Sequence, residues 1–329
     1  MDNSSTSPLA RIAEPISAEL QSYRALFEKT LQHDEPLLGE ALAYIRRREG
    51  KMMRPIWVLL TAREAGVVNE KVLTSAVSLE LLHTASLVHD DVVDESGLRR
   101  GQASVNHIYG NKVAVLVGDY LLSLLLCKAA ETEDSRIVQR IARLGGTLSE
   151  GEIVQLDSSR REVPDEAAYF HIIEHKTAAL FATCAELGAM AGCGNPETIE
   201  RAYQYGKLIG ICFQIRDDIF DFYEDSNIGK PTGNDLLEGK FTLPVIYVLQ
   251  NTPHPTLQPL IDRVKGCEAT PEDVATLVEF TKTNGGIDYA VSVMERYRNE
   301  AIDLLKGFKD KAVRDALTDY ANYVAARKI

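Results

Sequence analysis

The sequence predicts an all-α protein, because two of its features persist from end to end. Apolar residues return at helical spacing in long blocks rich in Ala, Leu and Glu, whereas the strict alternation that is typical of strands is scarce. No linker of disordered composition divides the 329 residues. We therefore expect one all-α domain over residues 1–329, with residues 1–14 disordered.

The expected helices are separated by polar or glycine-bearing connections, and some begin with typical capping chemistry, as at Asn195 and Pro196. In chain order they are expected near residues 15–31, 35–48, 53–65, 69–94, 103–107, 111–131, 134–157, 165–190, 196–223, 233–251, 256–265, 271–283, 285–306 and 310–327. Two connections, residues 95–104 and 224–241, directly follow aspartate clusters and combine glycine with Lys or Arg. Such loops are candidates for an active site.

Composition and charge exclude some functions. The chain is 45% hydrophobic and 26% charged, which is ordinary for a soluble globular protein. Its formal net charge of −12 argues against a nucleic-acid partner, which would require a basic surface. An acidic protein that handles an anion needs a local basic cluster or metal ions.

Cysteine usage and hydropathy favour a cytoplasmic protein. The five cysteines are odd in number, scattered and without zinc-binding spacing, so we expect reduced side chains. The first residues lack the basic and apolar segments of a secretory signal. The most apolar stretch, residues 113–130, is interrupted by Asp119 and bounded by Lys112 and Lys128. This pattern favours a buried helix over a transmembrane segment.

Two aspartate clusters carry the strongest functional signal. In SLVHDDVVDESGLRRG, residues 86–101, Asp90 and Asp94 lie one helical turn apart and Asp91 lies about 100° round the helix. The same spacing recurs in the second cluster, which consists of Asp217, Asp218 and Asp221. One cluster alone is typical of a solvated acidic helix end, although a helix C-terminus disfavours anions. Two copies, each after an apolar helix and before a basic loop, indicate a shared ligand.

The carboxylates of each cluster repel one another. Magnesium ions that bridge the aspartates to a diphosphate are the simplest compensation for this repulsion. Mg²⁺ prefers oxygen ligands and is usually held by one or two carboxylates together with phosphate oxygens. Neither cluster is enriched in His or Cys, which argues against zinc. The two clusters are therefore expected to face each other across a cavity with a diphosphate between them.

Basic residues near the aspartate helices are candidates for binding phosphate. A guanidinium can bind phosphate oxygens with two hydrogen bonds, while lysine acts as a point charge. Any one of these residues alone could be a solvated surface residue, but together they favour an anion site. The candidates are Lys51, Arg54, Arg99, Arg100, Lys176, Lys230 and Lys240.

Over about residues 40–329 the chain resembles the trans-isoprenyl diphosphate synthases of the polyprenyl synthetase family, most of all the long-chain, octaprenyl-type enzymes. The motifs that carry the resemblance are GKMMRP, LLHTASLVHDDVVDESGLRRGQAS, LVGDYLL, GEIVQL, HKTAALF, FQIRDDIFDF and GKPTGNDLLEGKFTLP. The resemblance implies an isoprenoid synthase fold with helices around a central catalytic cavity, and a homodimer. It also implies that isopentenyl diphosphate condenses with an allylic diphosphate, such as farnesyl or geranylgeranyl diphosphate, with the help of three Mg²⁺ ions.

The resemblance further implies a role for each motif residue. Metal ligands are expected at Asp90, Asp94 and Asp217, with Asp91, Asp218 and Asp221 in supporting or water-mediated positions. The allylic diphosphate is expected beside Arg99, Lys176 and Lys240, and isopentenyl diphosphate beside Lys51, Arg54, His83 and Arg100, while Lys230 is expected to bind substrate without assignment to either one. Thr177, Gln214 and Phe213 would line the region of the allylic cation. His83 lies two turns before Asp90 on the same helical face, which agrees with this division.

Chain length is expected to depend on side chains one turn before the first aspartate cluster, where bulk stops the growing tail in this family. Ala85 and Ser86 occupy these positions and are too small to act as a stop. One helical turn rises about 5.4 Å, which is close to one isoprene unit. The next candidate stops are Leu82 on the same helix and Leu126 on the neighbouring helix. We expect a long product, octaprenyl diphosphate for a quinone side chain, with a geranylgeranyl or farnesyl product as the alternative.

Two other functions are compatible with parts of this pattern. A non-catalytic subunit of a heteromeric synthase would keep the fold but lose aspartates or basic residues, and this chain retains both sets. A class I terpene cyclase shares an aspartate cluster but does not need an isopentenyl diphosphate site. The expected partners are the two diphosphate substrates and a second copy of the chain. Nucleic acid and a transmembrane segment are not expected, although brief contact with a membrane could help product release.

Overall fold

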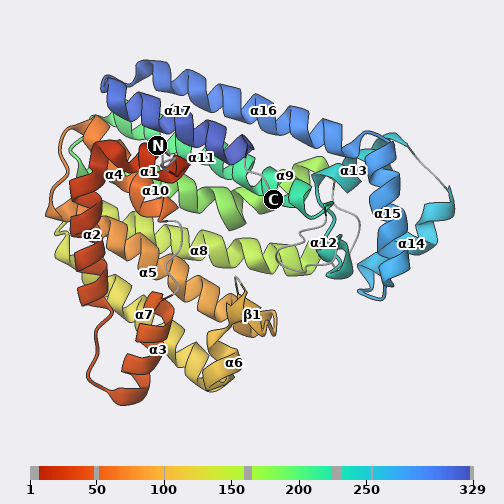
Figure 1. The fold of residues 1–329 in the computed structure, drawn as a ribbon, viewed down its shortest axis with the longest axis horizontal. Coiled ribbons are helices and arrows are strands. Elements are labelled where there is room, and N and C mark those ends of the chain that lie inside the picture. Colours follow the sequence, from red (N-terminus) through yellow and green to blue (C-terminus); the bar gives the residue numbers. More distant parts are fainter. Residues whose placement is uncertain are drawn as a thin grey trace, which may run out of the picture. The chain divides into compact units, whose positions relative to one another are not determined.

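The computed structural model describes residues 7–47, 52–99, 101–158, 165–223, 232–252 and 255–326, and these residues are almost entirely helical (Figure 1). The predicted all-α class is therefore confirmed. The chain divides into two compact units. The first comprises Met1–Gly145, Thr183–Tyr203 and Lys306–Asp319, and the second comprises Gly146–Ala182, Gln204–Leu305 and Tyr320–Ile329. The expectation of one domain stays a prediction.

The first unit contains the amino-terminal helices and a short hairpin. Its elements are α1 (Pro8–Ala13), the 3₁₀ turn η1 (Glu14–Ile16), α2 (Ser17–Thr30), α3 (Pro36–Arg47), α4 (Met53–Ala65), α5 (Glu70–Val93), β1 (Leu98–Arg99), β2 (Gln102–Ala103), α6 (Val105–Tyr109) and α7 (Asn111–Glu131).

The second unit contains α9 (Glu166–Ile173), the π-turn η2 (Glu174–Ala178), α12 (Asn234–Leu237), α13 (Leu243–Asn251), η3 (Pro255–Leu257), α14 (Gln258–Lys265), α15 (Pro271–Thr283) and α16 (Gly286–Leu304). Residues of both units occur in α8 (Ser135–Ser158), α10 (Ala179–Ala191), α11 (Pro196–Phe220) and α17 (Lys311–Ala326), and η4 (Leu305–Gly307) joins α16 to α17.

Helix α5 forms the core of the first unit and carries the first aspartate cluster at its carboxyl end. Asn69 caps its start by accepting a hydrogen bond from the Val72 backbone N–H at 3.1 Å. The helix packs along α7 and also contacts α2 and α4 (Figure 1). Asp94 is its C-cap residue. The aspartates therefore stand where the buried helix emerges from the core.

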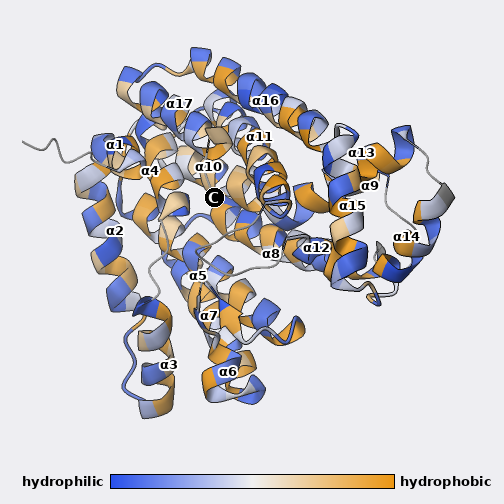
Figure 2. Ribbon diagram, turned by 45° about the vertical axis from the view of Figure 1, so that its right-hand side comes forward, coloured by the Kyte–Doolittle hydropathy of each residue, from blue (hydrophilic) through white to orange (hydrophobic). Residues whose placement is uncertain are grey.

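Helix α7 is buried on one side only. Ala114, Val117 and Leu121 are buried, while Leu116 is 67% and Leu126 is 56% exposed. Figure 2 shows hydrophobic residues along much of this helix. Among the described residues it is the helix that is long and apolar enough to cross a membrane by length and composition, and 33% of that apolar window is buried. The buried helix expected here is thus buried on one side, and its outer side is exposed.

A π-turn interrupts the helix that the sequence predicts over residues 165–190. This turn, η2, contains Lys176 and Thr177 and lies between α9 and α10. Gly151 on α8 comes so close to it that an added Cβ would lie 2.9 Å from the Lys176 backbone nitrogen. Such turns insert one residue into a helix and are frequent at functional sites. Here the turn places two predicted site residues beside α8.

Three other expectations about elements need correction. Residues 1–14 are not disordered throughout, because Pro8–Ala13 form α1 and the Ser7 hydroxyl accepts a hydrogen bond from the Ala10 N–H. The helix expected over residues 233–251 is two helices, since Gly239 adopts a positive φ of 74° and Pro244 starts a new first turn. The loop over residues 95–104 contains an antiparallel hairpin that pairs Leu98 with Ala103.

Candidate active site

The first aspartate cluster is held by the hairpin that follows it. Asp91 is only 2% exposed, and its carboxylate Oδ1 accepts hydrogen bonds from Arg99 Nε at 2.7 Å and Nη2 at 2.6 Å. The Asn106 side chain donates to the Asp91 backbone oxygen at 3.0 Å. Asp90 is half-buried, whereas Asp94 is exposed. Asp91 thus forms an ion pair with Arg99, so Asp90 and Asp94 are the better candidates for metal ligands.

A cavity of about 270 Å³ in the first unit brings four of the predicted residues together. They are Arg54, His83, Asp91 and Arg99. One face of α5 forms a wall of the cavity, because residues three, four and seven apart share a helical face. Lys51 and Arg100, which the sequence assigns to the same substrate, lie outside the described residues, as does Lys230 of the second unit.

Arg54 enters this cavity already paired with a carboxylate that the motifs did not indicate. Its Nε donates to Glu80 Oε2 at 3.1 Å and its Nη2 donates to Oε1 at 3.2 Å. Burial by itself would lower the pKa of the Arg54 guanidinium, but the charge and hydrogen bonds of Glu80 raise it above its ordinary value. Arg54 is therefore a permanently charged group with a fixed orientation.

The residues proposed for the chain-length tunnel lie on or beside α5. Ala85 is fully buried and Leu82 is 5% exposed. Ser86 is half-buried, and its hydroxyl donates to the His83 backbone oxygen at 2.9 Å. Leu126 on α7 is exposed, so in this single chain its side chain is not enclosed. The tunnel itself stays a prediction.

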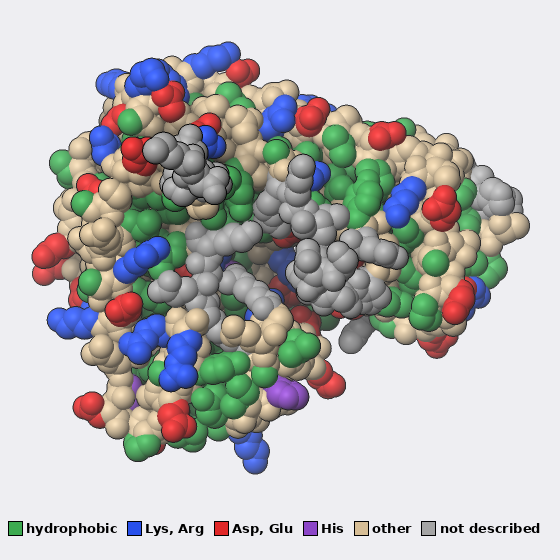
Figure 3. All heavy atoms as spheres, viewed as in Figure 1, with side chains coloured by type: hydrophobic (Ala, Val, Ile, Leu, Met, Phe, Trp, Pro, Cys, Tyr) green, Lys and Arg blue, Asp and Glu red, His purple; other side chains and the backbone are tan. Residues whose placement is uncertain are grey.

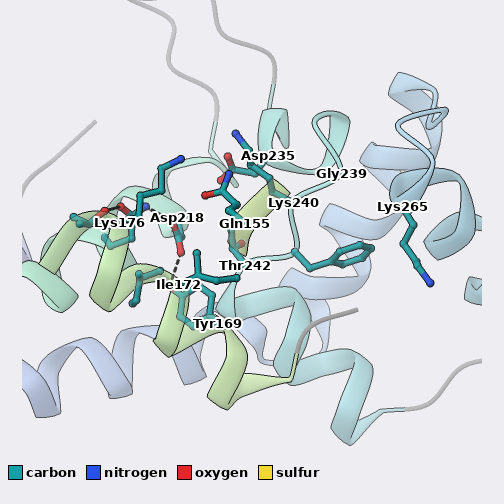
Figure 4. A pocket seen from close by; sticks show the side chains of 14 residues that line it. Gln155, Tyr169, Ile172, Lys176, Asp218, Asp235, Gly239, Lys240, Thr242 and Lys265 are labelled. Carbon is teal, nitrogen blue, oxygen red and sulfur yellow. Dashed lines mark hydrogen bonds between the residues drawn. The ribbon is translucent and has the colours of Figure 1, made fainter. Parts of the chain in front are cut away.

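A second cavity, of about 250 Å³, lies in the second unit and collects most of the residues predicted around the allylic diphosphate (Figure 4). The predicted residues in its lining are Lys176, Thr177, Gln214, Asp218 and Lys240. Figure 4 shows Asp218 turned toward Tyr169, Gln155 close to Asp235 and Lys240, and Lys265 turned away from this group.

A chain of hydrogen bonds fixes the centre of this cavity. Thr177 Oγ1 donates to Gln214 Oε1 at 2.7 Å, which turns the Gln214 amide nitrogen toward Asp218 Oδ1 at 2.8 Å. The Tyr169 hydroxyl donates to Asp218 Oδ2 at 2.5 Å. Both oxygens of this 4% exposed carboxylate thus have a protein donor. Asp218 is thus held between Tyr169 and Gln214, and the site role predicted for it stays a prediction.

Burial has a large effect on the protonation of this network. It raises the pKa of the Asp218 carboxyl to about 8, and the nearby charge of Asp235 adds to the increase. The hydrogen bonds from Tyr169 and Gln214 favour the ionised form and oppose part of that rise. Burial likewise raises the pKa of the Tyr169 hydroxyl well above its ordinary value, so Tyr169 remains a donor.

Both lysines predicted to bind the allylic diphosphate have carboxylate partners. Lys176 Nζ lies 2.8 Å from Glu152 Oε1 and 2.9 Å from Oε2, and Glu152 belongs to the GEIVQL motif on α8. Lys240 Nζ lies 2.5 Å from Glu238 Oε2. These glutamates position the ammonium groups, and a phosphate can share or replace them because each ammonium has three donors.

The second aspartate cluster ends α11 and organises the segment that follows. Asp221 accepts hydrogen bonds from the backbone N–H groups of Asn234 at 3.0 Å and Asp235 at 3.1 Å, so it caps α12. Its backbone oxygen accepts a third from Gly233 at 2.7 Å. Asp217 is half-buried one turn earlier. The metal role predicted for Asp221 stays a prediction, while its capping role is observed.

The donor chemistry of both clusters fits a hard divalent cation. Among the described residues no group of three or more His, Cys, Asp or Glu side chains forms a metal cage by itself. This agrees with an ion that takes only one or two carboxylates per site and fills its remaining positions with water and substrate phosphate. Asp90, Asp94 and Asp217 offer such carboxylates. Whether the two clusters oppose each other stays a prediction.

Sequence patterns missed Tyr169, Glu80, Glu152 and Asp235. Tyr169 looks like one more aromatic on an apolar helix face, and Glu80 looks like a polar residue on α5. Glu152 and Asp235 lie inside the motifs GEIVQL and GKPTGNDLLEGKFTLP, which was the available signal for them. Glu80 and Tyr169 act through contacts with residues 26 and 49 positions away, which periodicity does not reveal.

Comparison with known proteins identifies the family of this chain. Residues 35–279 match the polyprenyl synthetase family. Heptaprenyl diphosphate synthase component 2 of Geobacillus stearothermophilus is 36% identical over 320 residues, which cover 95% of this chain and 97% of that protein. The crystal structure of geranylgeranyl pyrophosphate synthase from Bacteroides thetaiotaomicron has a TM-score of 0.85 and 45% identity, covering 98% of this chain and 100% of the other.

A polyprenyl synthase from Caulobacter crescentus CB15, crystallised with calcium and isoprenyl diphosphate, has a TM-score of 0.90 and 30% identity, with 98% of each chain covered. The chain therefore belongs to the polyprenyl synthetase family, a family of prenyltransferases. This confirms the resemblance, the enzyme class and the all-α isoprenoid synthase fold predicted from the motifs.

Proposed function

We propose that this protein is a trans-prenyltransferase that condenses isopentenyl diphosphate with an allylic diphosphate, such as farnesyl or geranylgeranyl diphosphate, to make a long all-trans polyprenyl diphosphate. The observation that carries the proposal is the cavity of the second unit. It brings Lys176, Thr177, Gln214, Asp218 and Lys240 together from segments that are distant in sequence. These residues supply cations for a diphosphate and oxygen dipoles for an allylic cation.

Lys176 and Lys240 would bind the allylic diphosphate and stabilise the charge that develops on the departing pyrophosphate. Their ammonium groups are already oriented by Glu152 and Glu238. Mg²⁺ ions, which we propose as three and held by Asp90, Asp94, Asp217 and Asp221, would supply Lewis-acid stabilisation of the same leaving group. The calcium in the Caulobacter crescentus relative supports a divalent cation here.

Thr177 and Gln214 would stabilise the allylic cation through their oxygen atoms. Each oxygen keeps a lone pair after the hydrogen bond between them, and the bond fixes their direction. The double bond of isopentenyl diphosphate would then attack the cation and form the new carbon–carbon bond. The carbocation that results would lose a proton, for which the released pyrophosphate is a candidate acceptor, and so form the double bond of the product. No side-chain nucleophile takes part. Asp218 and Tyr169 would keep Gln214 oriented throughout.

The cavity of the first unit would bind isopentenyl diphosphate. Arg54 and His83 line it, and the resemblance assigns Lys51 and Arg100 to the same substrate. Glu80 occupies Nε and Nη2 of Arg54, so the Nη1 edge remains for a phosphate oxygen. An ionised guanidinium in a half-enclosed cavity binds phosphate through charge-assisted hydrogen bonds.

For the product we propose octaprenyl diphosphate, because Ala85 and Ser86 provide no bulk one turn before the first aspartates. A heptaprenyl-type relative supports a long product, whereas the 45% identical geranylgeranyl synthase favours the shorter alternative. We propose that the α5 side chains near Ala85 and Ser86 decide between the long and the short product.

The exposed apolar side of α7 supports a homodimer. Val115, Leu116 and Leu126 are all large hydrophobic residues at least 40% exposed. A second copy of the chain would bury them at low cost. The relative named as a component indicates the alternative, in which a different chain covers this side. Molar mass by light scattering distinguishes the two, since a protein purified alone would be a dimer only in the first case.

We also propose that the enzyme forms one domain and works in the cytoplasm. All five cysteines are free, which is consistent with a reducing compartment.

Incubation of the purified protein with farnesyl diphosphate, isopentenyl diphosphate and Mg²⁺, with products separated by length, tests the proposed function. We expect all-trans polyprenyl diphosphates of about eight isoprene units. Turnover by the protein alone would exclude a non-catalytic subunit. A cyclised hydrocarbon, or no product with any allylic primer, would contradict the proposal.

A further inference from the structure

Three arginines that no motif indicates, Arg24, Arg46 and Arg47, line the cavity of the first unit. Arg24 comes from the middle of α2, and Arg46 and Arg47 come from the last turn of α3. Arg24 and Arg47 are exposed and Arg46 is half-buried, whereas the Arg54 side chain is only 16% and the Arg99 side chain 31% exposed. Arg54 and Arg99 are therefore the deeper arginines of the cavity, and the other three lie nearer its mouth.

We propose that Arg24 and Arg46 bind the terminal phosphate of isopentenyl diphosphate and make this site select a diphosphate over a monophosphate. The inference rests on the proposed function, because that function supplies the ligand of the cavity. It adds two binding residues and a specificity that the motifs do not contain.

The deep arginines of the cavity are neutralised, whereas those at the mouth are not. Arg54 pairs with Glu80, and Arg99 pairs with Asp91. Within the described part of the chain, Arg24 and Arg46 form no ion pair, although Glu28 lies one turn after Arg24 and lines the same cavity. The surplus positive charge of the cavity thus resides at its mouth, where the outer phosphate of a ligand would lie.

Arg24 is also held beside the start of α4. Its Nε donates to the Met52 Sδ at 3.2 Å, and a thioether is a weak acceptor that a phosphate oxygen readily replaces. Met52 is the N-cap residue of the 13-residue helix α4, has a left-handed backbone with φ of 49°, and makes no capping hydrogen bond with its own side chain. The partial positive charge of this uncapped end adds to that of Arg24.

The surface over α2 and α3 is mixed in charge. Figure 3 shows Lys and Arg side chains there with Asp and Glu side chains among them. The positive charge that the proposal uses is therefore local to the cavity lining, where Arg24 and Arg46 lie.

The selectivity follows from the number of charges. A diphosphate ester carries about one more negative charge than a monophosphate ester, whose second pKa is about 6. Because Arg54 and Arg99 are already compensated, the additional charge is matched by arginines at the mouth, of which Arg24 and Arg46 are the two that the proposal assigns to the terminal phosphate. Loss of either one therefore weakens diphosphate binding more than monophosphate binding.

Calorimetry with isopentenyl diphosphate and isopentenyl monophosphate, without an allylic substrate and hence without turnover, tests this inference. We expect Arg24→Gln and Arg46→Gln each to weaken diphosphate binding about tenfold, equivalent to ~1.4 kcal/mol, and monophosphate binding threefold or less. Arg24→Lys should retain an intermediate affinity, since it keeps the charge and loses the second hydrogen bond. Arg143→Gln, an exposed arginine of α8 outside the cavity lining, is the control and should change neither ligand.

The inference is overturned if Arg24→Gln and Arg46→Gln bind isopentenyl diphosphate like the wild type, or if both ligands lose affinity by the same factor. If Arg24→Gln does not fold, Arg24→Lys and Arg46→Gln decide the question. A failure of the proposed function looks different, because the wild-type protein itself would then neither bind isopentenyl diphosphate nor turn it over.

Discussion

The hydroxyl of Tyr169 is the most informative single group to remove from the second unit. Tyr169→Phe keeps the ring in place and deletes the donor that lies 2.5 Å from Asp218 Oδ2. The carboxylate is 4% exposed, so water cannot easily replace the lost hydrogen bond. Gln214 remains as the other donor, at 2.8 Å.

The size of the effect depends on whether Asp218 is ionised. A hydrogen bond to a charged group contributes roughly 1.5–3 kcal/mol, and one between neutral groups roughly 0.5–1.5 kcal/mol. Since the pKa of Asp218 is raised to about 8, the carboxyl is mostly protonated at pH 6 and mostly ionised at pH 9. The loss of unfolding free energy in Tyr169→Phe should therefore be about 1 kcal/mol larger at pH 9 than at pH 6.

Urea unfolding of metal-free protein at the two pH values measures this difference, and steady-state kinetics measure its effect on catalysis. We expect kcat/KM for farnesyl diphosphate to fall about tenfold, because Asp218 no longer holds Gln214 firmly. The KM for isopentenyl diphosphate should not change. Tyr289→Phe is a matched control, since it deletes a 2.7 Å hydrogen bond to the half-buried Glu166 in the same unit but outside the cavity lining.

Tyr289→Phe should lose less unfolding free energy than Tyr169→Phe does at pH 9, because water can replace the hydrogen bond to the half-buried Glu166, and its kinetics should not change. An equal loss of stability at pH 6 and pH 9 in Tyr169→Phe would refute the assignment of a raised pKa to Asp218. Unchanged kinetics with farnesyl diphosphate would refute the positioning role of the Tyr169–Asp218–Gln214 chain.

Three further predictions test other parts of the site. Ala85→Phe and Ser86→Phe should shorten the product, which chromatography of dephosphorylated products measures. Ala85→Phe should also lose about 1–3 kcal/mol, because Ala85 is fully buried, and unchanged product length in both variants would contradict the tunnel. In the metal-free wild type the free energy of unfolding should fall as pH rises from about 4 to about 8, by up to about 1.4 kcal/mol per pH unit, because the pKa of Asp218 is raised. In Asp218→Asn this fall should be smaller when urea unfolding is measured at several pH values. An unchanged dependence on pH would contradict the raised pKa of Asp218. Chelation by EDTA should abolish turnover and added Mg²⁺ should restore it; persistent activity without metal would exclude the proposed role of the aspartates.

Much of the architecture was predictable because helical periodicity is local. The ranges expected for α4, α7 and α15 agree with the structure to the residue. The hairpin at Leu98–Arg99 and Gln102–Ala103 was missed, since strands of two residues are too short to show alternation. The division of residues 233–251 into α12 and α13 did have a local signal, Gly239 and Pro244, which the apolar pattern around them concealed.

The candidate site was predictable to the extent that it consists of motif residues. The pairing of those residues was not, because it depends on which segments pack together. Glu80 reaches Arg54 across 26 positions and Tyr169 reaches Asp218 across 49. Neither partner belongs to a motif of charge or spacing. Sequence patterns thus located the groups that would touch substrate, while the residues that position them required the structure.

These pairings limit how a protein with a net charge of −12 would bind two anionic substrates. Four of the cations expected to contact phosphate have a carboxylate partner: Arg54 with Glu80, Arg99 with Asp91, Lys176 with Glu152 and Lys240 with Glu238. An unpaired charge in such an enclosed position would be costly, so the partners keep the empty cavities stable and the cations oriented. A diphosphate must then share or displace those carboxylates, which lowers its net gain from each cation. Tight binding consequently depends on positive charge that is not compensated within the protein. In the first unit Arg24 and Arg46 provide that charge, and at the aspartate clusters Mg²⁺ would provide it.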